Sequence, residues 1–110
     1  MALREPPLTL GIEEEYLLVE KASGAVAAEP PDELFTALHE RTAGRAFPEF
    51  LRAQVEVATP VCRDIAEARR ELAGLRKAVI EEAGRFGLAP IAASSHPFSL
   101  TSKQKRTDKE

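Results

Sequence analysis

The chain has few of the features that would place a protein in a membrane, on nucleic acid or in an oxidising compartment. Its single cysteine, Cys62, cannot form an internal disulfide and suits a reducing cytosol. No run approaches the ~20 apolar residues of a membrane span, and Met1–Pro7 has an acid and two prolines where a signal peptide has its apolar stretch. A formal charge of -3 gives no electrostatic case for nucleic acid. We therefore expect a cytoplasmic protein without membrane or nucleic-acid partners.

The composition is that of one small globular domain. The chain has 110 residues, of which 44% are apolar and 30% charged. It has no tryptophan, one tyrosine and five phenylalanines, so alanine and leucine must supply most of the core. Only two histidines are present to activate a thiol, and we interpret Cys62 as a small buried hydrophobe rather than a nucleophile.

Three consecutive glutamates, 13–15, interrupt a segment that otherwise predicts a buried strand from about Leu8 to Val19. Glutamate is depleted in strands, and crowded like charges repel. Side chains alternate along a strand, so Glu13 and Glu15 share one face, roughly 7 Å apart at Cα. A hard divalent ion such as Mg²⁺ takes carboxylate oxygens together with phosphates. The triplet therefore indicates metal-dependent phosphate chemistry, and the alternative is a solvated sheet face that is merely acidic.

The rest of the chain alternates between strand and helix patterns. The strand at 51–59 has apolar residues on one face and Arg52, Gln54 and Glu56 on the other. Pro90 shortens the last strand or places it at a sheet edge. We expect, in order, a short strand at 25–28, a helix at 32–41, a strand at 51–59, a long helix from Asp64 and a strand at 88–95.

The long helix has the clearest pattern in the chain. Asp64 and Glu67 have the spacing of a capping box. The opposite face carries charged residues, including Lys77 and Glu81, and we expect it to be solvated. One buried stripe is predicted from apolar residues at three- and four-residue steps: Ile65, Ala68, Leu72, Leu75, Val79, Ala83 and Phe86.

These patterns combine into an α+β fold, with a mostly antiparallel sheet, helices packed on one face and an acidic metal-binding face on the other. If the three main strands are neighbours, their polar groups share the face away from the helices. Clustered carboxylates raise one another's pKa unless a cation neutralises them. The polar groups are Glu13 with Glu15, Gln54 with Glu56, and Ser95 with His96.

Three segments, Gly11–Val19, Gln54–Cys62 and Ser95–Phe98, resemble the opening motifs of the bacterial carboxylate–amine ligase family. That family is related to glutamate–cysteine ligases and has a catalytic sheet like that of glutamine synthetase. The resemblance covers nearly the whole chain. It implies an enzyme that uses ATP and Mg²⁺ or Mn²⁺ to join the carboxylate of an amino acid to an amine. In such enzymes ATP phosphorylates the carboxylate, and the amine then displaces phosphate from the acyl phosphate.

The resemblance also implies roles for individual residues. Glutamates would hold the divalent ions that neutralise the polyphosphate, and a histidine would lie near phosphate or the substrate carboxylate. The implied metal ligands are Glu13, Glu15 and Glu56, with Glu49 as a weaker fourth; the catalytic residues are Glu13, Glu56 and His96; and Gln54 and Arg52 bind the nucleotide.

Members of that family are much longer than this chain. We therefore expect residues 1–110 to be an N-terminal fragment of a longer ligase catalytic domain, inactive by itself. Strand edges left uncovered would then pair with another chain, giving a homodimer or a larger assembly. The alternative is a non-catalytic interaction or dimerisation module with the same fold, which would lack affinity for divalent ions.

Overall fold

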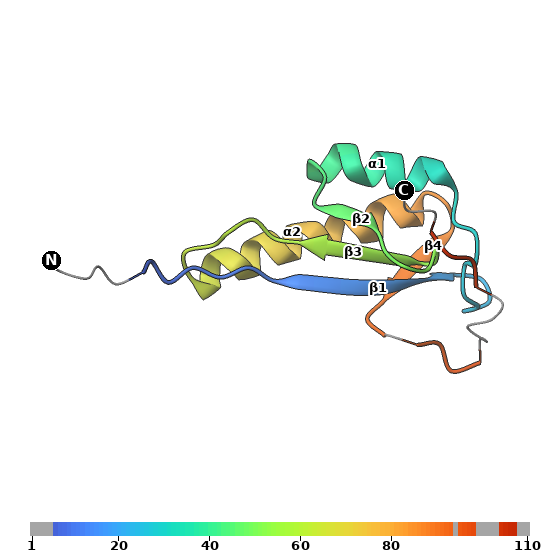
Figure 1. Cartoon of the computed structure of the whole chain (residues 1–110). Helices are drawn as coiled ribbons and strands as arrows, with labels where there is room; N and C mark the ends of the chain where they lie inside the picture. Colours follow the sequence, from blue (N-terminus) through green and yellow to red (C-terminus); the bar gives the residue numbers. More distant parts are fainter. Residues whose placement is uncertain (1–5, 94, 99–103, 108–110) are drawn as a thin grey trace, which may run out of the picture.

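The computed structural model describes residues 6–93, 95–98 and 104–107. Within these residues the chain forms a four-stranded antiparallel sheet with two helices packed against it (Figure 1). The strand order is β2-β3-β1-β4, which makes β1 a central strand and confirms the α+β prediction. The elements are β1 (Glu13–Glu20), α1 (Asp32–Thr42), β2 (Ala46–Pro48), β3 (Gln54–Ala58), α2 (Ile65–Gly84) and β4 (Leu88–Ile91).

The core lies between the sheet and the helices. Both Tyr16 and Leu18 of β1 point to this side, because they belong to the same buried cluster as the helix residues. From here on, the side of the sheet that meets α1 and α2 is the helix face, and the other side is the open face. The core cluster consists of Tyr16, Leu18, Ala27, Leu34, Leu38, Ala46, Val55, Val57, Leu75, Val79, Ala83 and Leu88.

The helix α2 follows its predicted pattern in the middle and departs from it at both ends. The side chain of Asp64 caps the helix by accepting from the backbone N–H of Glu67 at 2.8 Å. Ile65 is 72% exposed and Phe86 36% exposed, so the predicted stripe is wrong at these two positions. Figure 1 shows the reason at the first turn, where α2 extends past the ends of the strands.

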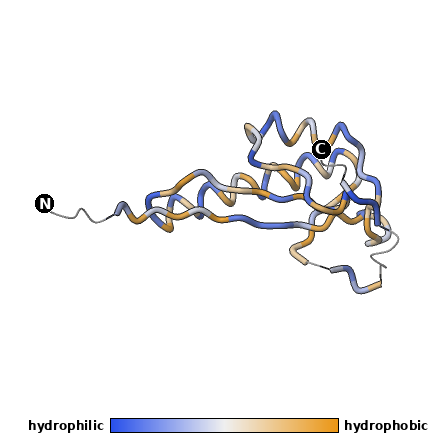
Figure 2. Tube along the Cα trace, in the orientation of Figure 1, coloured by the Kyte–Doolittle hydropathy of each residue, from blue (hydrophilic) through white to orange (hydrophobic). Residues whose placement is uncertain are grey.

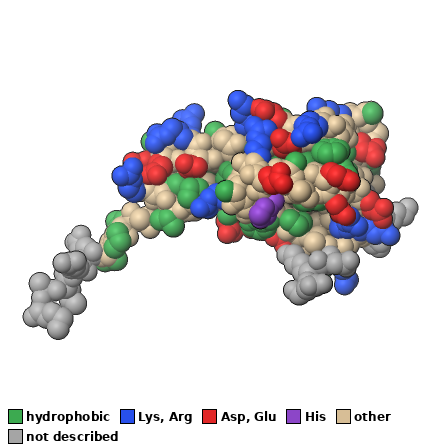
Figure 3. All heavy atoms as spheres, turned by 90° about the horizontal axis from the view of Figure 1, so that it is seen from above, with side chains coloured by type: hydrophobic (Ala, Val, Ile, Leu, Met, Phe, Trp, Pro, Cys, Tyr) green, Lys and Arg blue, Asp and Glu red, His purple; other side chains and the backbone are tan. Residues whose placement is uncertain are grey.

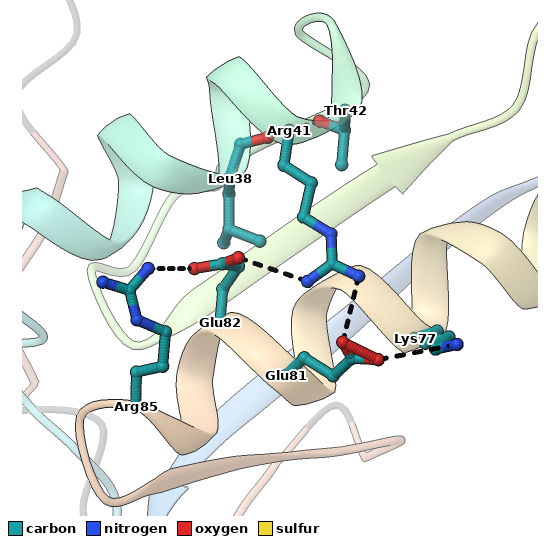
Figure 4. Close-up of polar contacts among 7 residues, drawn as sticks. All are labelled: Leu38, Arg41, Thr42, Lys77, Glu81, Glu82 and Arg85. Atoms are coloured by element: carbon teal, nitrogen blue, oxygen red, sulfur yellow. Dashed lines mark hydrogen bonds and ion pairs between the residues drawn. The ribbon is translucent and has the colours of Figure 1, made fainter.

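Ion pairs join the C-terminal part of α1 to α2 (Figure 4). The Arg41 guanidinium contacts Glu82 Oε1 at 3.2 Å and Glu81 Oε2 at 3.1 Å. Arg85 binds the other oxygen of Glu82 at 2.8 Å. Glu81 stays exposed, as predicted for this charged face, although it pairs with Arg41; Glu82, which the prediction did not include, is buried where α1 packs against α2.

The strands are shorter than predicted. Leu10, in the segment before β1, makes only an isolated bridge to Cys62. Val26, in the segment after β1, makes only an isolated bridge to Val19. The strand β2 was not predicted, because three residues ending in Pro48 give no periodic signal. β4 ends at Ile91 and lies at the sheet edge, as Pro90 predicted. In the part of the chain that the structure describes, neither helix has the length and apolar character needed to cross a membrane.

Candidate functional site

The register of β1 against β3 places three glutamates on the open face. Glu15 lies directly opposite Glu56, and Glu13 lies opposite Ala58. Directly paired residues project to the same side of a sheet. The backbone bonds from Leu18 to Ala53 and from Thr59 to Ile12 mark the hydrogen-bonded pairs. Glu15 and Glu56 therefore form a non-hydrogen-bonded pair, in which side chains approach most closely.

Glu49 joins this group from the segment between β2 and β3. Hydrogen bonding to Glu49, partial burial and the negative charges of Glu49 and Glu13 together raise the pKa of Glu56 to about 7. We call Glu13, Glu15, Glu49 and Glu56 the acidic cluster. The carboxyl groups of Glu13, Glu49 and Glu56 are near enough to share a proton, which holds the pKa of Glu56 above its ordinary value.

Gln54 fixes one member of the acidic cluster. This residue is 8% exposed, and its Nε2 donates to Glu15 Oε1 at 2.9 Å. Its Oε1 accepts from the backbone N–H of Leu51 at 3.0 Å, which defines the orientation of the amide. Gln54 thus orients Glu15, and its predicted role in nucleotide binding stays a prediction.

The donor atoms of the acidic cluster suit a hard divalent ion, because Mg²⁺ prefers carboxylate oxygens. Within the described ranges, however, no three His, Cys, Asp or Glu side chains are disposed to hold a metal ion. As placed, the carboxyl group of Glu56 hydrogen-bonds to Glu49 and Glu13. A cation would replace the shared proton, and the side chains would have to reorient toward it.

Two predicted site residues lie elsewhere. Arg52 is in the turn before β3, and its guanidinium pairs with Asp32 of α1 at 3.0 Å, so strand parity does not carry it to the open face. His96 Nε2 lies 2.7 Å from the carbonyl oxygen of Gly24. The N–H of Gly24 donates to the carbonyl of Glu20, at the end of β1 away from the three glutamates. The prediction that Arg52 and His96 lie beside the glutamates of the open face is therefore wrong. Any role in binding substrate or nucleotide stays a prediction.

A second polar group, on the helix face, was missed by the sequence interpretation. Arg76 of α2 donates from Nε to Glu14 Oε1 at 2.7 Å and from Nη2 to Glu14 Oε2. The Tyr16 hydroxyl also donates to Glu14. The only sequence signal was the presence of Glu14 on an otherwise apolar strand face, and nothing local pointed to a partner 62 residues away.

The surface beside the cluster is hollowed. A hollow of about 200 Å³ is lined by Glu14, Glu15, Tyr16, Ala92 and Ala93, where the chain leaves β4. Small-molecule sites are usually concave, with a few convergent polar groups. This hollow therefore places an open volume next to Glu15, one member of the acidic cluster.

Comparison with known proteins gives a consistent result over nearly the whole chain. The family described as "Glutamate-cysteine ligase family 2" matches residues 9–110. A relative from Rhodospirillum rubrum is 54% identical over 98% of this chain and 29% of its own length, and one from Jannaschia sp. is 54% identical over 93% and 27%. A relative from Paracoccus denitrificans is 47% identical over 96% and 28%. All three carry the name "Putative glutamate--cysteine ligase 2", and the chain spans less than a third of their length.

Proposed function

The chain belongs to glutamate–cysteine ligase family 2, and we propose that it forms part of the catalytic sheet of an ATP- and Mg²⁺-dependent carboxylate–amine ligase. The observation that carries this proposal is the acidic cluster, on the open face of a chain whose family match runs from residue 9 to 110. We propose further that the sheet is of the glutamine-synthetase type. The substrates would be ATP, an amino-acid carboxylate and an amine, with glutamate and cysteine as the expected pair.

In this proposal Glu13, Glu15, Glu49 and Glu56 would hold Mg²⁺ or Mn²⁺ through carboxylate oxygens. The bound ion would supply charge neutralisation for the polyphosphate and the transferred phosphoryl group. Glu56 would first release its proton, since a protonated carboxyl is a poor ligand for a cation. Gln54 would keep Glu15 in place, through the hydrogen bond at 2.9 Å.

The reaction would proceed in two displacements. An oxygen of the substrate carboxylate attacks the γ-phosphorus of ATP, which forms an acyl phosphate and releases ADP. The amine nitrogen then attacks the acyl carbon, loses a proton, and expels inorganic phosphate as the amide forms. Positioning and charge neutralisation supply most of the catalysis in phosphoryl transfer. The open face would contribute the negative charge that gathers the ions for the first step.

The metal part of the proposal is tested by titrating the 110-residue chain with Mn²⁺ in a calorimeter. We expect weak binding that is lost in Glu13→Gln and in Glu56→Gln. Glu71→Gln is the matched control, because Glu71 is exposed on α2 and lies outside the acidic cluster. A wild-type chain that binds no Mn²⁺ would contradict the proposal.

The ligase part is tested in a chimera that carries residues 1–110 in place of the matched segment of the Rhodospirillum rubrum relative. We expect ATP-dependent phosphate release with glutamate and cysteine, and loss of that release in Glu13→Gln or Glu56→Gln. We expect no ligation from the 110-residue chain alone, which spans 29% of that relative. Turnover by the 110-residue chain would contradict this expectation and show that the open face is enough for ligation.

A second candidate is a self-association module, and exposed apolar side chains favour it. Leu8, Val61 and Ile65 are 89%, 74% and 72% exposed around the Leu10–Cys62 bridge. Such patches often mark protein contacts. We propose a homodimer or larger assembly, to be checked by sedimentation velocity. A monomer at high protein concentration would refute it, and Mn²⁺ binding separates a pure association module from the ligase proposal.

A further inference from the structure

The side of β1 that meets the helices carries Tyr16 and Leu18 in the core and a single glutamate, Glu14, before them, whereas the other side carries Glu13 and Glu15. Within β1, residues Tyr16 to Val19 are buried on both faces, with exposures of 5%, 1%, 0% and 7%. The three residues before them are glutamates. Figure 2 shows this division as a hydrophilic stretch at the start of β1 followed by a hydrophobic one. Because side chains alternate with period two, a slip of one residue would exchange the two faces. That slip would turn Glu13 and Glu15 toward the helices, so the pattern favours the observed register, and Glu14 is the residue that works against it.

Arg76 compensates for Glu14 in the observed register. Its guanidinium binds both carboxylate oxygens of Glu14, and the Tyr16 hydroxyl donates to the same carboxylate. Bidentate pairs of this kind have strict geometry as well as strength. They can form only when Glu14 and Tyr16 are on the helix face, where Arg76 projects from α2.

The neighbour of Glu14 across the sheet makes this contact more important. Glu14 is paired with Val57, which is fully buried in the core. A carboxylate beside an apolar core is costly unless it is paired and hydrogen-bonded. Without Arg76, the register that places Glu14 next to Val57 loses the cation that compensates for it.

We propose that Arg76 is a positioning residue for the acidic cluster. By pairing with Glu14 on the helix face, it stabilises the register of β1 that presents Glu13 and Glu15 to the open face. A one-residue slip would present Glu14 alone, in place of two glutamates. The part of this inference that concerns ions rests on the proposed function, whereas the part that concerns strand register does not.

The test compares three variants of the 110-residue chain with a control. Arg76→Ala removes the contact, Arg76→Lys keeps the charge without the bidentate geometry, and the exchange of Glu14→Arg with Arg76→Glu restores an ion pair in reversed order. Lys77→Ala is the control, because Lys77 is the next residue of α2 and pairs with Glu81 instead. NMR detects the register through the Hα–Hα contact between Glu15 and Glu56, which short non-hydrogen-bonded pairs give. Calorimetry measures the affinity of the acidic cluster for Mn²⁺.

We expect Arg76→Ala to weaken the Glu15–Glu56 contact, to add a second set of β1 resonances, and to lower Mn²⁺ affinity about tenfold, as outer-shell changes do. Arg76→Lys should give values between those of wild type and Arg76→Ala. The exchange of Glu14→Arg with Arg76→Glu should restore both the Glu15–Glu56 contact and the Mn²⁺ affinity. An Arg76→Ala chain with the native contact and native Mn²⁺ affinity would overturn the inference. If that variant does not fold, Arg76→Lys decides in the same way. A wild-type chain without Mn²⁺ affinity would defeat the proposed function, and the NMR contact would still decide the register.

Discussion

Glu14 and Glu56 lie in adjacent strands of one sheet, on opposite faces, and their surroundings shift their pKa values in opposite directions. Hydrogen bonds from Arg76 keep the pKa of Glu14 below its ordinary value. Glu56 hydrogen-bonds to Glu49 and lies near the charge of Glu13, which raises its pKa to about 7. The helix face neutralises its glutamate within the molecule, whereas the open face crowds its glutamates together.

The difference separates a structural carboxylate from a candidate functional one. Figure 3, which shows the molecule from the side of the helices, has basic and acidic side chains intermixed over that surface. Such pairing stabilises the fold or is neutral to it. Crowded like charges cost stability, and strongly raised carboxyl pKa values gather at functional sites. The open face is therefore the surface on which a cation would reduce the repulsion between carboxylates.

The largest expected effect tests the helix face. Leu75→Ala should lower the free energy of unfolding by about 2–5 kcal/mol, because it empties part of the core beneath α2. Leu75 is 7% exposed and belongs to the core cluster. Chemical denaturation monitored by circular dichroism measures the change. Arg70→Ala, at an exposed position on the same helix, should stay within about 0.5 kcal/mol of wild type. Equal midpoints for the two variants would mean that the helix face is misidentified.

A smaller effect is expected where α1 meets α2. Glu82→Gln should lower the thermal midpoint more than Glu81→Gln, because the Glu82 side chain is 12% exposed and that of Glu81 is 46% exposed. Arg85 and Arg41 lower the pKa of Glu82 below its ordinary value of 4.5. This contribution is therefore present above pH 4.5 and lost as the pH falls through the lowered pKa. Melting curves at pH 7 and in acid should show the difference between the variants only at pH 7.

Much of the fold, and part of the site, could be predicted from local pattern. Alternation alone brought Glu13, Glu15 and Glu56 to one face, because antiparallel pairing preserves parity across neighbouring strands. The helix positions of Leu75 and Val79 followed from three- and four-residue spacing.

The errors arose where tertiary contacts decide. Ile65 continues the apolar spacing of α2, but it lies beyond the sheet and is left exposed. His96 follows a strand pattern, but β4 ends at Ile91 and the chain then turns toward Gly24. The partner of Glu14 lies on another element, and no local spacing identifies Arg76.

The smallest expected effect tests the open face. Glu56→Gln should raise the stability of the ion-free chain at pH 8 by about 1 kcal/mol, a value reduced from that of a fully buried group by solvent screening. The reason is that the folded state holds a proton on Glu56 up to about pH 7, whereas an ordinary glutamate releases it near 4.5. Between these values the folded state binds more protons than the unfolded state, so the stability of the wild-type chain falls as the pH rises. Thermal melts from pH 4.5 to 8 measure this slope.

In Glu56→Gln the fall across that window should be reduced, because the neutral amide takes no part in the titration and no longer adds a charge beside Glu13, Glu15 and Glu49. Glu71→Gln, with the same chemical change on the exposed surface of α2, should keep the wild-type slope. Millimolar Mg²⁺ should raise the wild-type midpoint at pH 8 and leave that of Glu56→Gln unchanged, since a ligand stabilises only the form that binds it. Identical pH profiles for wild type and Glu56→Gln would show that the carboxylates do not crowd one another, and the contrast with Glu14 would then be lost.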